Sequence, residues 1–184
     1  MKKAKNILRG VLVAVASLIA AEQAYAQSHT VQSGNWKIDY TKEANYEYET
    51  ASNTSTNEID LGYPYSNHSR MVMQIITKSN SDLNLVALTV GRFNCPQSTN
   101  MCLINARFDN GPIQQFHIAD KELVLKSSKP ALGTNMLLLE TSQFINDIIH
   151  SHRLTIEANL DQGLKVYEFD VSGLLEGMRQ AIIK

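Results

Sequence analysis

Short alternating stretches of apolar and polar residues are the main pattern in residues 35–184. Residues 35–40 place their three large apolar side chains on one face of a strand. Residues 153–160 alternate more strictly, and a turn at 161–163 joins them to residues 164–171, which we expect to be the hairpin partner. This spacing predicts a strand near the start of the pattern and a β-hairpin near its end.

The middle of the chain carries further β patterns. Residues 70–77 and 82–90 are apolar segments separated by a short polar stretch, which predicts a hairpin. The second segment is apolar on both faces, so we expect it to lie centrally in the sheet. Shorter strands are expected at 101–109, 113–119 and 122–127, with a tight turn at 120–121 and a brief apolar run at 136–139.

Two segments have helical spacing instead. The first contains Phe144, Ile145, Ile148 and Ile149, and Thr141 or Ser142 is available to cap its start. The second follows Ser172 as a cap and carries an apolar stripe made of Leu174, Leu175, Met178, Ala181 and Ile182. We therefore expect two short helices.

The sum of these elements predicts a mainly β protein. Strands dominate, and most are joined by turns of hairpin length, which favours an antiparallel β-sandwich or a partly open barrel over a parallel sheet. Residues 41–69 are polar and are expected to hold one or two short strands, with 51–57 as a loop.

The first 26 residues have the layout of a secretory signal peptide. A basic start precedes an apolar run at 11–21, which is about half the length that a spanning helix needs. Ala24 and Ala26 place small residues where a signal peptidase reads them, so cleavage is expected before Gln27. Residues 27–34 are then expected to form a flexible lead-in, and residues 35–184 a single β-rich domain.

Loss of the signal peptide changes the charge of the chain. The full sequence has 17 Lys and Arg against 18 Asp and Glu, and residues 1–26 hold four of the former and one of the latter, which leaves a net charge of −4. An acidic product has no general attraction to nucleic acid or to anionic lipid. No later apolar run approaches the length of a membrane span, so none is expected after cleavage.

The two cysteines, Cys95 and Cys102, are separated by six residues. In an oxidising compartment, cysteines this close most simply form a disulfide with each other. The alternatives are a redox pair or half of a metal site, but the spacing is not Cys-x-x-Cys and no further soft ligand is near. We expect a structural disulfide and neither a metal nor a cofactor.

Signatures of several enzyme classes are missing. The sequence contains no Gly-x-Ser-x-Gly, no glycine-rich phosphate loop and no dinucleotide fingerprint, and no catalytic residue is assigned. His150 and His152 are the one close histidine pair, and they suit either a metal or base site or the carbonyl end of a helix. Glu168 and Asp170 project on one face of a strand, as a carboxylate pair or as a solvated face balanced by Lys165 or Arg153.

Tyrosines gather in one part of the chain. Five of the seven lie within residues 40–65, and we single out Tyr46, Tyr48, Tyr63 and Tyr65 as candidate contacts with a partner protein. Tyrosine gives a large contact area at a low cost in side-chain entropy, so it is common on binding surfaces. The alternative is that Tyr46 and Tyr48 are packed residues on one face of an edge strand.

The order of motifs resembles a loose group of small exported bacterial proteins that includes VasI-like proteins associated with type VI secretion. The similar pieces are a Trp-containing first strand at 34–38, Ala-Arg-Phe-Asp-Asn-Gly at 106–111, the segment from Phe144, and Phe-Asp-Val-Ser-Gly-Leu at 169–174. The similarity covers roughly residues 83–178. It implies a periplasmic, β-rich, non-catalytic accessory protein, and it transfers no catalytic residue to this chain.

We therefore expect a periplasmic or secreted binding module that acts on another envelope or extracellular protein, with a possible link to secretion or envelope assembly. One alternative is an exported hydrolase that uses His117, His150 or His152 with a carboxylate. Another is a small-ligand carrier, which would need an apolar cavity of roughly 300 Å³ or more.

Overall fold

The structure is a computed structural model that describes residues 27–43, 46–65, 67–78, 84–96, 101–125 and 134–183. The expected signal peptide, residues 1–26, lies outside the described residues, as does nearly all of the expected loop at 128–134.

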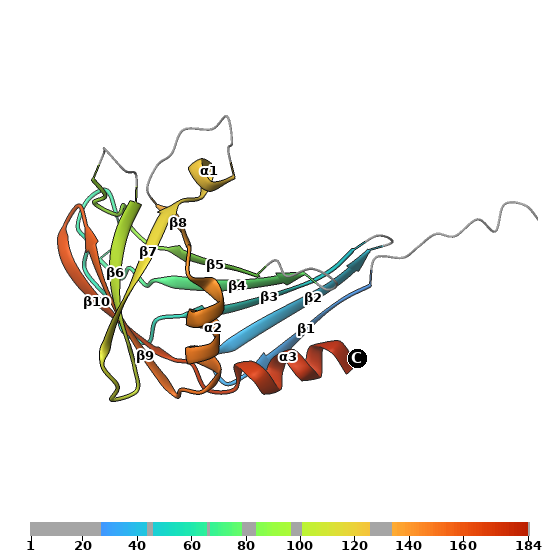
Figure 1. Ribbon diagram of the computed structural model, residues 1–184. Helices are drawn as coiled ribbons and strands as arrows, with labels where there is room; N and C mark the ends of the chain where they lie inside the picture. Colours follow the sequence, from blue (N-terminus) through green and yellow to red (C-terminus); the bar gives the residue numbers. More distant parts are fainter. Residues whose placement is uncertain are drawn as a thin grey trace, which may run out of the picture.

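The described residues form one antiparallel sheet of ten strands. Its first half contains β1 (Gln27–Ser33), β2 (Trp36–Glu43), β3 (Tyr46–Thr54), β4 (Val72–Lys78) and β5 (Asn84–Thr89). Its second half contains β8 (Asn135–Leu138), β7 (Ile113–Asp120), β6 (Met101–Phe108), β9 (Arg153–Leu160) and β10 (Gly163–Asp170). The strand order is β1-β2-β3-β4-β5-β8-β7-β6-β9-β10. The halves lie at a steep angle to one another, and the sheet does not close into a barrel (Figure 1). The mainly β, antiparallel class is confirmed.

Three helical segments accompany the sheet: α1 (Lys121–Val124), α2 (Thr141–Ile149) and α3 (Leu174–Ile183). α3 packs against β1 and β2, whereas α2 contacts β5 and α3 (Figure 1). α1 is a single turn beside β7 and β8. The two expected helices are therefore present. None of the helices in the described part of the chain has the length and hydropathy that a membrane-spanning helix needs.

The core lies between the sheet and the two longer helices. Phe144 of α2 meets Phe108 and Phe116 edge to face, with ring centroids 5.5 and 5.1 Å away. All three rings are almost fully buried, and such perpendicular contacts stabilise aromatic clusters beyond the area that they bury. The helical spacing of Phe144 and Ile148 thus places both side chains in the core.

Several predicted strands are confirmed by the pairing. β4 pairs with β5, and β9 pairs with β10, both antiparallel and both as hairpins. β5 lies between β4 and β8, and Val86, Ala87 and Leu88 are all buried. The apolar character of both faces therefore did indicate a central strand.

The expected lead-in at 27–34 differs from the structure, because residues 27–33 form strand β1. β1 pairs with β2 along its whole length, across a two-residue turn in which Gly34 has a φ of 58°. A glycine adopts this left-handed conformation without strain, which suits a tight hairpin. Only Val31 of β1 is a buried apolar residue. The strand is held mainly by backbone pairing, which composition does not reveal.

The expected loop at 51–57 is wrong for its first four residues, which belong to β3. Asn53 points into the core at 1% exposure, and its Nδ2 donates a hydrogen bond to the carbonyl oxygen of Asp170 at 2.8 Å. A polar residue at a buried strand position hides the alternation that would have indicated a strand.

Residues 56 and 57 run along the outer edge of β10. The Thr56 N–H donates to the carbonyl oxygen of Glu168 at 2.7 Å. The side-chain amide of Asn57 donates to the carbonyl oxygen of Val166 at 2.9 Å and accepts from the Glu168 N–H at 2.8 Å. This amide therefore takes the place of a backbone peptide at the edge of the sheet.

The strand expected at 122–127 is also wrong within the described residues, because Lys121–Val124 forms a helical turn. Asp120 Oδ1 accepts a hydrogen bond from the Glu122 N–H at 2.9 Å, which is how an aspartate begins a helix. The tight β-turn expected at 120–121 is for the same reason absent.

The expected cap of α2 is a further correction. The N-cap residue is Glu140, and no side chain caps the helix, so neither Thr141 nor Ser142 has the expected role. The Glu140 side chain instead binds His117 of β7.

Candidate binding surfaces

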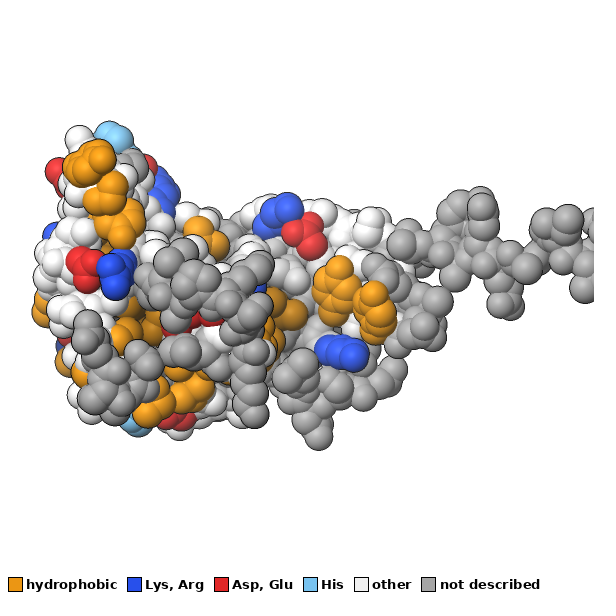
Figure 2. Space-filling view, turned by 90° about the horizontal axis from the view of Figure 1, so that it is seen from above, with side chains coloured by type: hydrophobic (Ala, Val, Ile, Leu, Met, Phe, Trp, Pro, Cys, Tyr) orange, Lys and Arg blue, Asp and Glu red, His pale blue; other side chains and the backbone are white. Residues whose placement is uncertain are grey.

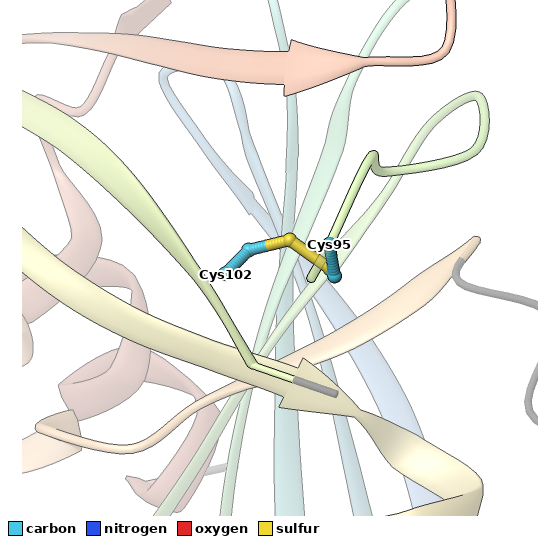
Figure 3. The surroundings of a disulfide bond; sticks show 2 residues. All are labelled: Cys95 and Cys102. Carbon is cyan, nitrogen blue, oxygen red and sulfur yellow. A yellow bond between two sulfur atoms is a disulfide. The ribbon is translucent and has the colours of Figure 1, made fainter. Parts of the chain in front are cut away.

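The predicted disulfide joins Cys95 to Cys102, whose Cα atoms are 4.9 Å apart (Figure 3). Cys102 is buried in β6, and Cys95 follows Phe93, which forms an isolated bridge with Leu160. The bond therefore fixes the chain after β5 against the second half of the sheet. No free cysteine is present in the described residues.

Tyr46 and Tyr48 lie on the outer face of β3, side by side. Their ring centroids are 6.3 Å apart at an interplanar angle of 26°, and Lys78 Nζ lies 6.0 Å from the Tyr46 ring. Tyr46 is 44% exposed. On the face seen from above, a group of hydrophobic side chains at the β1–β5 end of the molecule lies next to a basic side chain (Figure 2). Two aromatic rings and a cation thus share one accessible face.

Tyr63 and Tyr65 lie at the other end of β4. Tyr65 packs against the core and lies near Gly91, which follows the end of β5. At that end of β5, Thr89 pairs with Val72, the first residue of β4. Tyr48, by contrast, pairs with Lys78, the last residue of β4. Six residues of strand separate the two positions, or about 20 Å. Tyr63 is 99% exposed. The four candidate tyrosines therefore form two pairs rather than one surface.

His150 and His152 do not come together as a site. His150 Nδ1 lies 2.7 Å from the carbonyl oxygen of Asn146, in the last turn of α2. The backbone N–H of His152 donates to Asp109, and its ring is exposed. His150 thus lies at the C-terminal end of α2, where a polar side chain can bind a helix carbonyl that has no backbone partner.

His117 of β7 binds the carboxylate of Glu140, the residue at which α2 begins. Its Nδ1 lies 2.6 Å from Glu140 Oε1, and its backbone N–H donates to Glu140 Oε2 at 2.9 Å. Partial burial would raise the pKa of Glu140, but these two hydrogen bonds outweigh burial and hold the pKa below its ordinary value. The pair anchors the start of α2 to β7. It does not line the grooves described below.

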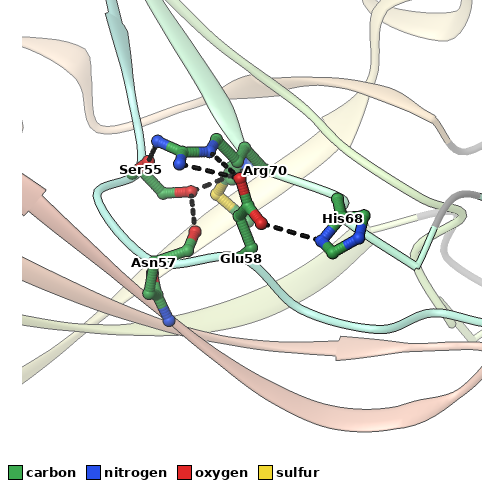
Figure 4. Close-up of polar contacts among 6 residues, drawn as sticks. Ser55, Asn57, Glu58, His68 and Arg70 are labelled. Atoms are coloured by element: carbon green, nitrogen blue, oxygen red, sulfur yellow. Dashed lines mark hydrogen bonds and ion pairs between the residues drawn. The ribbon is translucent and has the colours of Figure 1, made fainter.

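A second charged cluster, which the sequence did not indicate, holds the chain between β3 and β4 (Figure 4). Arg70 donates from Nε and Nη2 to Glu58 Oε1 at 3.0 and 2.8 Å, and from Nη1 to the carbonyl oxygen of Ser55. His68 Nδ1 lies 2.9 Å from Glu58 Oε2. The hydrogen bonds from Arg70 and then His68 lower the pKa of Glu58. All these partners lie within one 16-residue segment, so the cluster is a loop anchor.

A groove of about 390 Å³ lies on the outer face of β6, β9 and β10. Its charged lining residues are Arg107, Asp109, Arg153, Glu168 and Asp170. The predicted common face of Glu168 and Asp170, with Arg153 opposite, is confirmed, because Asp170 pairs with Arg153 across the hairpin. Lys165 pairs with Ala158 and so belongs to the other face.

The alternation of each strand explains why these charges face outward. Leu154 and Ile156 of β9 point into the core, which leaves Arg153 and Thr155 outside. β6 pairs with β9 so that Arg107 lies opposite Thr155. Arg107 and Arg153 are therefore diagonal neighbours on two adjacent strands, and their side chains enter the same groove.

Asp109 ends β6 at the mouth of the groove with a φ of 49°. Its Oδ1 accepts hydrogen bonds from the backbone N–H groups of Arg153 at 2.8 Å and His152 at 3.0 Å. These two hydrogen bonds lower the pKa of Asp109. The Asp170 carboxylate is engaged in the same way, because its Oδ1 accepts from the Ser172 N–H at 3.0 Å.

The two arginines of the groove have no acidic partner among the residues that the structure describes. Throughout the described ranges, neither forms an ion pair with a carboxylate within 4.0 Å. Arg153 Nη2 makes one long hydrogen bond, of 3.4 Å, to Asn110 Oδ1. Arg107 and Thr155 also line a second hollow of about 80 Å³ that extends to Ile113 of β7. Arg107 thus lies between two neighbouring hollows, which together border four strands, and Arg153 lines the larger of them.

No group of three or more histidine, cysteine or acidic side chains in the described residues is arranged to hold a metal ion. The groove is polar and open, unlike the apolar cavity that a carrier of small apolar ligands would need. Its arginines suit recognition of a carboxylate or phosphate, which a guanidinium binds through two parallel hydrogen bonds. Comparisons of the chain with protein-family models, with curated proteins and with solved structures gave no match.

Proposed function

We propose that this chain is an exported binding or accessory protein that contacts another envelope or extracellular protein, in the periplasm or outside the cell. The observation that carries the proposal is the pair Tyr46 and Tyr48 beside Lys78 on the outer face of β3 and β4. Aromatic side chains with an exposed, rigid face supply much of the binding energy in protein interfaces.

Four further observations support export and a binding role. The first 26 residues have the layout of a signal peptide, and the Cys95–Cys102 disulfide suits an oxidising compartment. The resemblance to small exported proteins of the VasI-like kind implies an accessory role in secretion or envelope assembly. The histidine and carboxylate pair at His117 and Glu140 serves as an anchor for α2, which leaves the hydrolase as the weaker alternative.

Export is tested by producing the full chain in a Gram-negative host, fractionating the cells and sequencing the N-terminus of the product. We expect a periplasmic or secreted product that begins at Gln27. A product that keeps residues 1–26 and stays in the cytoplasm would contradict the proposal.

The contact is tested with a photo-crosslinking amino acid placed at Tyr46 and, as a matched control, at Thr54 on the same face of β3. We expect a discrete adduct with one exported protein from position 46 only. The double change Tyr46→Ala and Tyr48→Ala should abolish co-purification of that protein, whereas Tyr63→Ala should retain it. If Tyr63→Ala alone abolished co-purification of that protein, the contact would lie at the other end of β4.

A further inference from the structure

The groove on β6, β9 and β10 contains two cations for which the described residues supply no carboxylate within 4.0 Å. Arg107 and Arg153 are neighbours, although three carboxylates line the same groove. Two of these carboxylates accept hydrogen bonds from the backbone and not from the guanidinium groups: Asp109 accepts from two N–H groups, and Asp170 accepts from one. The guanidinium groups therefore remain available to an anionic group of a ligand.

The signs of the surrounding charges limit what that ligand is. A polyanion or a phosphate dianion would meet Asp109, Glu168 and Asp170 as well as the arginines. A single carboxylate accompanied by a cationic group matches both kinds of charge, because the cation would lie by Glu168 and Asp170. The lining thus favours a ligand that carries one negative and one positive charge close together.

The register of the strands sets the spacing between these charges. Glu168, Thr155, Arg107 and Ile113 are cross-strand neighbours in one row across β10, β9, β6 and β7. Neighbouring strands lie about 4.8 Å apart, so the row spans about 14 Å. Residues i, i+2 and i+4 of an extended chain project on one side and span about 13 Å. An extended peptide that crosses the strands fits this row.

The row also gives the order of side chains. The acidic end is at Glu168 and Asp170, the arginines occupy the middle, and Ile113 is 49% exposed at the far end. We propose that this groove binds an extended peptide segment of another protein with a basic, an acidic and an apolar side chain at alternate positions, the acidic one held between Arg107 and Arg153. This site lies beyond the end of β3 opposite to Tyr46, so it is separate from the tyrosine contact.

The test is calorimetric titration of the purified exported protein with the acetylated and amidated peptide Gly-Lys-Ser-Glu-Ser-Leu-Gly. We expect saturable binding that Arg107→Gln and Arg153→Gln each weaken by about tenfold or more, since each removes charge-assisted hydrogen bonds. Lys37→Gln is the control for loss of a positive charge, because Lys37 lies on β2, forms an ion pair with Asp39 and does not line the groove. It should leave binding unchanged.

Changes in the peptide separate its two charges. Replacing its glutamate with glutamine should weaken binding to the unaltered protein, and it should have little further effect when Arg107 and Arg153 are both changed to glutamine. Replacing its lysine with alanine should weaken binding unless Glu168 has been changed to glutamine. Inorganic phosphate should bind more weakly than the peptide, and tighter binding of phosphate would overturn the assignment of a peptide ligand.

Amide chemical-shift mapping on the unaltered protein gives a result that does not depend on whether any variant folds. We expect the peptide to shift the signals of Arg107, Ile113, Arg153, Thr155 and Glu168. Absence of saturable binding, or shifts confined to other parts of the protein, would overturn the proposal. Loss of the tyrosine contact would leave these results unchanged, so the two proposals fail separately.

Discussion

The indole Nε1 of Trp36 donates a hydrogen bond of 3.0 Å to the carbonyl oxygen of Val171, 135 residues later in the chain. Trp36 is fully buried, and Val171 lies between β10 and α3. This one hydrogen bond therefore connects the second strand to the junction before the last helix.

Trp36→Phe should lower the free energy of unfolding by about 2–4 kcal/mol, because it leaves a buried carbonyl unpaired and a cavity beside it. Chemical denaturation followed by circular dichroism measures this, since the change removes the only tryptophan. Ile38→Val, at the next inward position of β2, is the control and should lower it by about 1 kcal/mol. Equal losses for the two variants would mean that the hydrogen bond contributes nothing.

Reduction of the Cys95–Cys102 disulfide should lower the free energy of unfolding by about 2–3 kcal/mol, from the chain entropy of so short a loop. The comparison is between the oxidised protein and the same protein with a reductant, by urea denaturation. Replacement of both cysteines by alanine should make the midpoint insensitive to reductant. If reductant moves the midpoint of that variant too, the effect is not due to the disulfide.

Glu49 lies on the inward face of β3 and is 5% exposed. Burial raises the pKa of its carboxyl group, and this effect is larger than the opposite effect of nearby His29, which lowers the pKa. Below the ordinary glutamate pKa both folded and unfolded states are protonated, so burial then has no cost. As the pH rises through the ordinary and then the raised pKa, the folded state is progressively destabilised. Glu49→Gln should therefore increase stability at pH 7 and have little effect at pH 4, as measured by urea denaturation at each pH.

Glu47 is the matched control, because it lies two residues away on the same face and its pKa is shifted the other way. A hydrogen bond from Lys42 lowers the pKa of Glu47. Its contribution to stability is present above the ordinary pKa and is lost as the pH falls through the lowered one. Glu47→Gln should therefore decrease stability at pH 7, if only slightly because solvent still reaches the ion pair, so the two variants should differ in sign.

Gly177 allows α3 to lie close to β1 and β2. A Cβ at this position would come within 2.3 Å of Ile38 Cδ1 and 2.8 Å of Ser33 Cβ. Gly177→Ala should therefore cost about 1–3 kcal/mol by overpacking, which exceeds the gain of about 1 kcal/mol in helix propensity. Thermal denaturation measures the difference, with Arg179→Ala as an exposed control in the same helix.

A second change checks the cause. Ile38→Val removes the Cδ1 atom that the new Cβ would meet, so it should recover part of the stability lost by Gly177→Ala. If the losses in stability from Gly177→Ala and Ile38→Val simply add in the double variant, the new Cβ does not clash with Ile38.

The strict alternation of β9 and the turn after it were enough to predict the hairpin of β9 and β10 and the outward face shared by Arg153, Glu168 and Asp170. The pattern there is local, and the buried positions of the two strands, such as Leu154, Ile156 and Tyr167, are apolar. The groove was not predictable, because its other arginine, Arg107, comes from β6, which pairs with β9 across about 50 residues. The residues near Arg107 do not indicate which strand will pair with β6.

The wrong predictions fall where polar side chains take buried or structural positions. Glu49 and Asn53 occupy inward sites of β3, so the apolar alternation is broken although the strand continues. β1 has few apolar residues and depends on its neighbour for pairing. At residues 120–124, one hydrogen bond from the Glu122 N–H to Asp120 favours a helical turn where the apolar run alone indicates a strand.

Asn57, which occupies the outer edge of β10, has a consequence for self-association. An exposed sheet edge recruits further strands through its unpaired backbone groups, and here that edge is taken by a side-chain amide. In the described sheet this leaves β1 as the edge open to such pairing. Two copies joined through β1 would expose only β10 edges, which residues 53–57 cover from Val166 to Asp170, so backbone pairing would end at a twofold dimer and would not propagate into a filament.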